Sequence, residues 1–166
     1  MQQHPLLQTK LYTPPIRPEL VSRPRLIERL NAGLTTRGAF PRALTLISAP
    51  AGFGKTTLAS EWIQALGRAT PPIAIAWLSL DEGDNELVRF LAYLIAALQT
   101  IEASIGKGLL SALQSTGVAD ASTAPPAEAV LTSVINDVTA LPDGMILVLD
   151  DYYLIEAQAV HDALPI

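Results

Sequence analysis

Hydrophobic residues follow two different spacings along the chain, and the first consists of short continuous runs. These are "RALTLIS" at residues 42–48, "IAIAWLSL" at residues 73–80 and "MILVL" at residues 145–149. All three are short and rich in apolar residues, several of them β-branched, so each predicts a β-strand. The third run shows no alternation, which is typical of a strand buried on both faces of a parallel sheet.

The second spacing is helical, and it occurs between these runs. Leu26, Ile27 and Leu30 predict a helix that Gly33 ends. Three further apolar faces predict three more helices: Leu58, Trp62 and Ala65; Leu87, Leu91, Leu94 and Leu98; and Val130, Val134, Val138 and Leu141. Strands that alternate with helices predict an α/β fold, with a parallel sheet flanked by helices.

Two segments show neither of these spacings. Residues 1–21 are expected to form an extended leader, because the first 19 carry four prolines and no period. Residues 102–126 are rich in Gly, Ser, Ala and Pro, so we expect a mobile insert or loop with at most one short helix around residues 109–113. The folded domain is then expected over residues 22–166.

Composition narrows the class of protein. A chain of 166 residues with 49% hydrophobic residues is long enough for one domain with a sizeable core. Its net charge of −5 argues against a broad nucleic-acid surface, so no direct DNA binding is expected of this segment. The absence of cysteine excludes disulfides and fits a cytoplasmic location. No apolar stretch predicts a signal peptide or a membrane span.

One motif in the sequence predicts a binding site for phosphate. Between the first run and the next helix lies a stretch that fits the phosphate-binding P-loop, with Ala49 where the first glycine usually stands: Ala49, Pro50, Ala51, Gly52, Phe53, Gly54, Lys55 and Thr56. Glycines let the backbone approach an anion, and its N–H groups and the helix N-terminus then bind phosphate oxygens.

The side chains of this P-loop have distinct predicted roles. Lys55 supplies a full positive charge for the β- and γ-phosphates, and the Thr56 hydroxyl binds Mg²⁺. Thr57, which follows in the helix, is counted with the phosphate-binding residues. We expect the Phe53 side chain to pack over the loop or onto a neighbouring domain. The alternative to the whole motif is an accidental glycine-rich turn.

A pair of carboxylates follows the last strand. Asp150 and Asp151 come at its carboxyl end, where α/β folds bind ligands. Asp150 is predicted to hold Mg²⁺ through a water or the Thr56 hydroxyl, and Asp151 to orient a water near the γ-phosphate. The alternative is that one of them only caps the next helix. Asp81 and Asp84 are interpreted as helix caps, with Asn85 as another candidate cap.

The remaining polar and aromatic residues have simpler interpretations. His4 and His161 lack metal-ligand spacing and are given no role. Trp62 and Trp77 are expected to fill the core.

Four segments together resemble the N-terminal nucleotide-binding domain of MalT-like, LuxR-family ATP-dependent transcriptional activators, which belong to the STAND class of P-loop NTPases. The segments, in order, are "KLYTPPIRPELVSRPRLIERL", "LISAPAGFGKTTLASEW", "WLSLDEGDNELVRFLAYLIAAL" and "MILVLDDYYLI". They cover nearly the whole chain apart from residues 102–126.

The resemblance implies a switch that binds ATP or ADP with Mg²⁺. In the family, ATP with an inducer gives an open, self-associating form, and slow hydrolysis resets it. The enzyme activity implied is at most that of a slow ATPase. "VSRP" matches the family's position near the adenine, which implies Val21 and Arg23 as base-pocket residues. Alternatively, Ser22 caps the following helix and Arg23 is a solvated charge.

The resemblance also implies missing parts. Family members continue into sensor repeats and a C-terminal helix-turn-helix, and this chain holds three of about five expected core strands, so the domain is expected to be truncated. Two alternative functions stay open: a catalytic P-loop ATPase or kinase of the AAA-type class, and a nucleotide-free scaffold. ATP turnover and ATP binding distinguish them.

Overall fold

The computed structural model describes residues 6–16, 18–34, 44–68, 73–116, 125–142 and 144–164. The chain divides into two compact units. Unit 1 comprises Met1–Tyr12, Ala76–Leu141 and Leu147–Ile166, and unit 2 comprises Thr13–Ile75 and Pro142–Ile146. Each unit is therefore assembled from segments that are far apart in the sequence.

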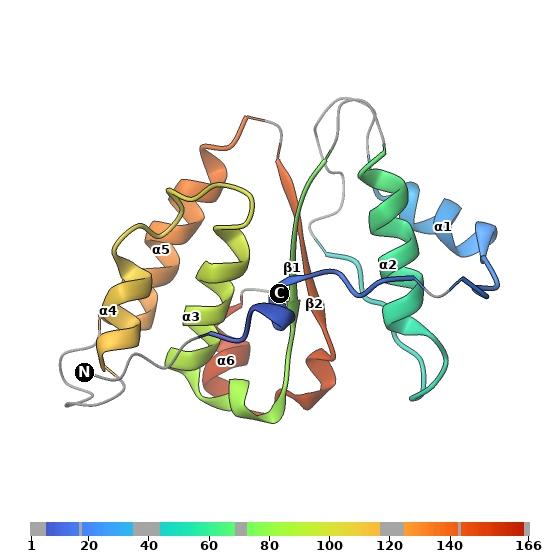
Figure 1. Cartoon of the computed structure of the whole chain (residues 1–166). Coiled ribbons are helices and arrows are strands. Elements are labelled where there is room, and N and C mark those ends of the chain that lie inside the picture. Colours follow the sequence, from blue (N-terminus) through green and yellow to red (C-terminus); the bar gives the residue numbers. More distant parts are fainter. Residues whose placement is uncertain are drawn as a thin grey trace. The chain divides into compact units, whose positions relative to one another are not determined.

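A parallel sheet of two strands, β1 (Ala74–Ser79) and β2 (Met145–Asp150), is the first feature of the fold (Figure 1). Just beyond β1, the Leu80 amide donates a hydrogen bond to the Asp150 carbonyl, 3.0 Å away. The strands predicted at residues 73–80 and 145–149 are confirmed, and the carboxyl ends of both strands lie in unit 1.

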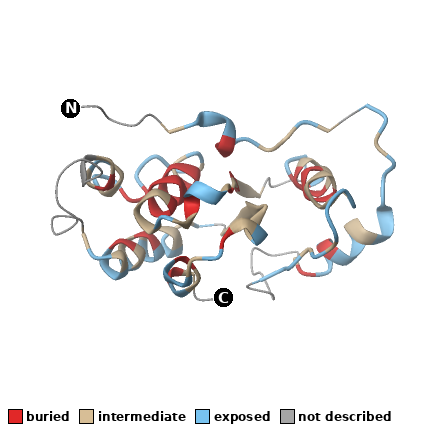
Figure 2. Ribbon diagram, turned by 90° about the horizontal axis from the view of Figure 1, so that it is seen from below, coloured by how far each residue is buried: buried red, intermediate tan, exposed pale blue. Residues whose placement is uncertain are grey.

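Helix α3 (Leu87–Leu98) is the centre of unit 1. It contacts α4 (Leu109–Thr116), α5 (Ala127–Thr139) and α6 (Gln158–Ala163). All nine residues from Phe90 to Leu98 are buried, so this part of the helix is covered on every side rather than on the single leucine face that its spacing predicted (Figure 2). A helix that is apolar all round is typical of a fully enclosed core position.

Short 3-10 helices also belong to unit 1, and three of them lie within the described residues. They are η1 (Gln8–Leu11), η2 (Glu82–Asn85) and η4 (Tyr152–Leu154). The segment η2 directly follows β1, and η4 directly follows β2, so both lie at the carboxyl end of the sheet.

Unit 2 contains α1 (Pro24–Asn31) and α2 (Lys55–Leu66), which pack against each other. The indole nitrogen of Trp62 donates to the Asn31 side-chain oxygen at 2.9 Å. Trp62 is buried in unit 2 and Trp77 in unit 1, so the prediction that both fill the core is confirmed.

The prediction of a strand just before the P-loop is wrong for residues 44–48, which are the part of it that the structure describes. Residues 42 and 43 lie outside the described residues, and residues 44–48 form no strand. Leu44 is 56% exposed and Leu46 is 80% exposed. A β-strand needs a partner that satisfies its backbone groups, and among the described residues the only ladder is the one between β1 and β2. The α/β class is confirmed, and the described residues hold two strands rather than the three that were predicted.

Two segments that were expected to be largely irregular each contain a short helix. Within the expected leader at residues 1–21, Gln8–Leu11 is helical, and Lys10 and Leu11 are buried. Within residues 102–126, the short helix is confirmed as α4, and Ile105 and Leu113 are buried. Residues 117–124 lie outside the described residues. No helix in the described ranges is long and apolar enough to cross a membrane.

Candidate nucleotide-binding site

The P-loop lies in unit 2, and its backbone turns sharply into α2. Gly52 has φ 80° and Gly54 has φ 75°, both in the left-handed region that favours glycine. The Phe53 amide donates to the Pro50 carbonyl at 3.3 Å, which closes the turn. Gly54 is the N-cap of α2 and no side chain caps the helix; the first helical bond runs from the Leu58 amide to the Gly54 carbonyl at 2.9 Å.

Lys55 begins α2, and its side chain reaches back over the loop. The ammonium Nζ donates to the Ala49 carbonyl at 3.0 Å and to the Pro50 carbonyl at 3.4 Å. The positive charge is therefore held beside the loop backbone. Thr56 and Thr57 occupy the first turn of α2, and both are half-buried.

These residues fit a phosphate group. A Cβ atom at Gly52 would meet nothing within 4 Å, so the glycine is required there by its positive φ and not by crowding. The helix N-terminus carries a partial positive charge, and the ammonium adds a full one. An anion bound at the first turn of α2 would replace the Ala49 and Pro50 carbonyls as the partner of the Lys55 ammonium.

The structure brings Arg23 to the P-loop. One guanidinium nitrogen, Nη1, donates to the Phe53 carbonyl at 3.0 Å. Val21, the other residue assigned to the base pocket, is 80% exposed. The alternative for Ser22 is wrong, because Arg23 is the N-cap of α1 and the Ser22 hydroxyl donates to the Glu61 carboxylate instead.

Phe53 itself is 61% exposed, although its side chain was expected to pack over the loop or onto a neighbouring domain. Packing over the loop is therefore limited, and the second expectation stays a prediction.

The acidic pair lies in unit 1, at the end of β2. Asp150 is the last residue of the strand. Asp151 has φ 57° and is the only non-glycine residue with a positive φ among the described residues. Its carbonyl accepts from the Leu154 amide at 3.0 Å, while its side chain makes no capping hydrogen bond to η4. A non-glycine residue in this region is unusual and often occurs at functional sites.

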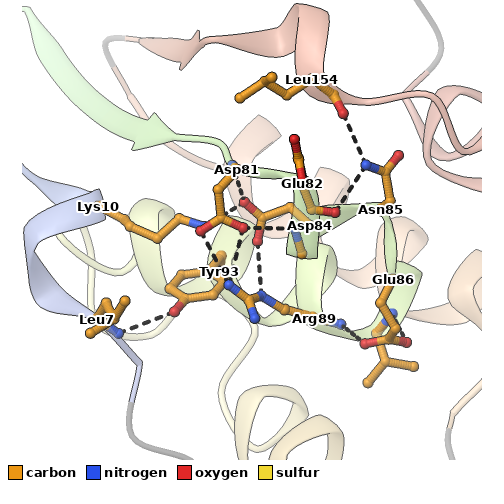
Figure 3. Close-up of polar contacts among 12 residues, drawn as sticks. Leu7, Lys10, Asp81, Glu82, Asp84, Asn85, Glu86, Arg89, Tyr93 and Leu154 are labelled. Atoms are coloured by element: carbon orange, nitrogen blue, oxygen red, sulfur yellow. Dashed lines mark hydrogen bonds and ion pairs between the residues drawn. The ribbon is translucent and has the colours of Figure 1, made fainter.

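Four charged residues and a tyrosine form a group in unit 1, which we call the Lys10 cluster and which sequence reasoning missed. It comprises Lys10, Asp81, Asp84, Arg89 and Tyr93 (Figure 3). The Lys10 ammonium binds the carboxylates of Asp81, at 3.0 Å, and Asp84. It also lies 4.2 Å from the centre of the Tyr93 ring. The Tyr93 hydroxyl accepts from the Leu7 amide at 3.1 Å, so η1 and α3 are joined twice.

Asp84 is the most buried member of the Lys10 cluster, with 0% exposure. Its carboxylate accepts from Arg89 Nε at 3.2 Å and from the Asp81 amide at 2.8 Å. The Asp81 side chain accepts from the Gly83 amide at 2.9 Å, which confirms its predicted capping role, here on η2. Neither Asp84 nor Asn85 caps α3, because Glu86 does so.

Charge within the cluster shifts two pKa values. Burial raises the pKa of Asp81. The hydrogen bond from Lys10 and the charges of Lys10 and Arg89 lower it by more, so the pKa lies below its usual value. Burial lowers the pKa of Arg89, but the charges of Asp81 and Asp84 and the hydrogen bond to Asp84 together outweigh burial, so the pKa of Arg89 is raised. Both residues are therefore held in their charged forms.

Other predicted residues are placed as follows. His161 was given no role, and its Nδ1 lies 2.7 Å from the Tyr152 hydroxyl oxygen. His4 lies outside the described residues. Within the described ranges, no group of three or more His, Cys, Asp or Glu residues is arranged to hold a metal ion. The predicted Mg²⁺ ligands are divided between the units, with Thr56 in unit 2 and Asp150 in unit 1.

The chain thus combines a P-loop turn at the start of α2 with a parallel strand, β2, that ends at Asp150 and is followed by Asp151. No protein-family profile matches the chain. It is 36% identical over 159 residues to the HTH-type transcriptional regulator MalT of Cronobacter sakazakii, and 35% identical over the same length to MalT of Klebsiella pneumoniae. Both alignments cover 96% of this chain and 16% of the relative.

The second kind of relative is the serine/threonine-protein kinase PknK of Mycobacterium tuberculosis. It is 35% identical over 145 residues, which is 87% of this chain and 12% of the kinase. The chain is therefore related, over nearly its whole length, to a segment of MalT-type regulators, which confirms the resemblance. A transcriptional regulator and a protein kinase therefore both contain a segment similar to this chain.

Proposed function

We propose that this chain is a nucleotide-binding module of a MalT-like regulator, and that it binds ATP with Mg²⁺ at the P-loop. The observation that carries this proposal is the geometry of residues 49–55. Two glycines with positive φ lead into a helix without a side-chain cap, and the Lys55 ammonium binds the carbonyls of Ala49 and Pro50. This combination places a cation and a helix N-terminus around one small region of backbone, as phosphate binding requires.

The residues have separate roles in this proposal. Residues 49–54 and Thr57 surround the phosphates with backbone groups, Lys55 neutralises their charge, and Thr56 with Asp150 holds Mg²⁺. Arg23, which binds the Phe53 carbonyl, and Val21 contribute to the base site. Asp151 orients water for a slow hydrolysis, and its unusual backbone conformation supports a role beyond a turn.

The biological consequence proposed is a switch. ATP that binds one conformation better than another shifts the equilibrium by its difference in affinity. Ligand at ~1,000 times its dissociation constant stabilises the binding state by about 4 kcal/mol. In a larger regulator, sensor repeats, a helix-turn-helix and self-association of the ATP form would respond to this shift.

Calorimetric titration with ATP and Mg²⁺ tests the proposal. Lys55→Ala should abolish binding and leave the fold nearly unchanged, because it removes the charge beside the loop together with hydrogen bonds to the nearby carbonyls of Ala49 and Pro50. Lys107→Ala is the matched control, since Lys107 is exposed and lies in unit 1. Wild-type affinity in Lys55→Ala would refute the role of Lys55.

Turnover measurements separate the alternatives. Fast ATP turnover would favour a catalytic ATPase or kinase, and failure of the wild-type chain to bind ATP would favour a nucleotide-free scaffold. Tight binding with slow turnover is the outcome that the switch requires.

A further inference from the structure

One side chain of unit 1, Asn85, uses all of its hydrogen-bonding groups on backbone. Its amide nitrogen donates to the Glu82 carbonyl at 3.0 Å and to the Leu154 carbonyl at 2.9 Å (Figure 3). Its oxygen accepts from the Glu156 amide at 2.7 Å and from the Ala157 amide at 2.8 Å. A primary amide has two N–H donors and one oxygen with two lone pairs, so the group is fully satisfied.

Three of these four bonds reach the segment that follows the acidic pair. Leu154 and Glu156 are separated from Asn85 by 69 and 71 positions in the sequence. Leu154 is held from two directions, because its amide donates to the Asp151 carbonyl and its carbonyl accepts from Asn85. The turn that contains Asp151 is therefore fixed by β2 on one side and by Asn85 on the other.

Asn85 is itself held in place. It ends η2, whose first turn is closed by reciprocal hydrogen bonds between Asp81 and Asp84. The carboxylates of these two residues bind Lys10 and Arg89. The backbone of Asn85 is thus tied to the Lys10 cluster through η2, in addition to the contacts of its side chain with residues 154–157.

We propose that Asn85 is a positioning residue that holds the Asp151 turn in its left-handed conformation, so that the Asp151 carboxylate keeps one direction. An amide is the side chain that this place requires, because it must donate to the carbonyls of Glu82 and Leu154 while it accepts from two N–H groups. Aspartate would keep the acceptor and lose the donor. The consequence for hydrolysis rests on the proposed function, whereas the contact with the turn does not.

Amide hydrogen exchange in the chain tests the contact. In Asn85→Ala, exchange at Glu156 and Ala157 should rise roughly tenfold or more relative to α3 amides, because two hydrogen bonds are lost. In Asn85→Asp, both amides should stay protected, since the carboxylate still accepts from them. Gln99→Ala is the control: this amide side chain donates to the Ile105 carbonyl at 2.9 Å, away from the turn. Unchanged exchange in Asn85→Ala would overturn the proposal.

Single-turnover hydrolysis with saturating Mg²⁺ and ATP tests the consequence. Asn85→Ala should slow hydrolysis and leave ATP affinity unchanged, and it should have no further effect in an Asp151→Asn background. An equal slowing in both backgrounds would show that Asn85 does not act through Asp151. If the wild-type chain fails to bind ATP while Asn85→Ala still releases the two amides, the contact stands and the proposed function fails.

Discussion

Replacing Lys10 by methionine is the sharpest test of the packing in unit 1. Methionine keeps most of the apolar stem and removes the charge that Asp84 faces. The Lys10 side chain is 8% exposed and that of Asp84 is 0% exposed, so the change leaves a buried carboxylate without its main partner. Removing one partner of a buried ion pair costs about 3–5 kcal/mol of folding stability.

The structure places the expected loss at the lower end of that range. Asp84 still accepts from Arg89 and from the Asp81 amide, and the Asp81 side chain is 47% exposed and open to water. We therefore expect Lys10→Met to lower the free energy of unfolding by about 3 kcal/mol. For a chain of this size that loss corresponds to a melting temperature lower by roughly 6–12 °C.

Urea denaturation, followed by tryptophan fluorescence, measures the loss. Trp77 reports on unit 1 and Trp62 on unit 2, so a Trp62→Phe background isolates the first signal. The control is Lys107→Met, an exposed lysine of the same unit, which should change stability by less than about 0.5 kcal/mol.

A double variant shows whether the loss comes from the ion pair. Lys10→Met with Asp84→Asn removes both charges, so its loss should be smaller than the sum of the two single losses. A loss below about 1 kcal/mol in Lys10→Met would refute the reasoning. Additive losses in the double variant would show that the pair itself does not stabilise the fold.

Two further predictions concern carboxylates. Asp150→Asn should weaken Mg²⁺-dependent ATP binding, while Asp151→Asn should keep binding and slow hydrolysis; wild-type hydrolysis in Asp151→Asn would rule out the water-orienting role. The lowered pKa of Asp81 contributes stability that is fully present above its unfolded pKa and is lost as pH falls below about 4. The stability difference between wild type and Lys10→Met should therefore shrink on acidification, as urea midpoints at neutral and acid pH would show; a constant difference would contradict the assignment.

Features set by neighbouring residues could be predicted from the sequence. The turn at Gly52 and Gly54 and the start of α2 follow from local backbone preferences. The strands β1 and β2 follow from apolar runs, and helix α5 from its valine spacing and flanking prolines. Each of these signals lies within a few residues of the feature that it predicts.

Features that depend on distant partners could not be predicted in this way. Residues 44–48 have the composition of a strand, but strand formation requires a neighbour, which sequence spacing does not reveal. Lys10 stands in a proline-rich segment that gives no local signal, and its partners Asp81 and Asp84 are 71 and 74 positions away. Asn85 resembled an ordinary helix cap, and only the structure shows that it binds Leu154 and Ala157.

The discontinuity of unit 1 has a consequence for its synthesis on the ribosome. The part of α3 from Phe90 to Leu98 is apolar on every side, yet β2 and α6 are encoded well after it. At ~5–20 residues per second, the ribosome needs several seconds to pass from α3 to β2. During that interval the nascent helix has no complete core to enter, and an exposed apolar segment is a binding site for chaperones and for other nascent chains. The yield of folded protein in cells should therefore depend on whether chaperones or other nascent chains bind α3 before β2 has been synthesised.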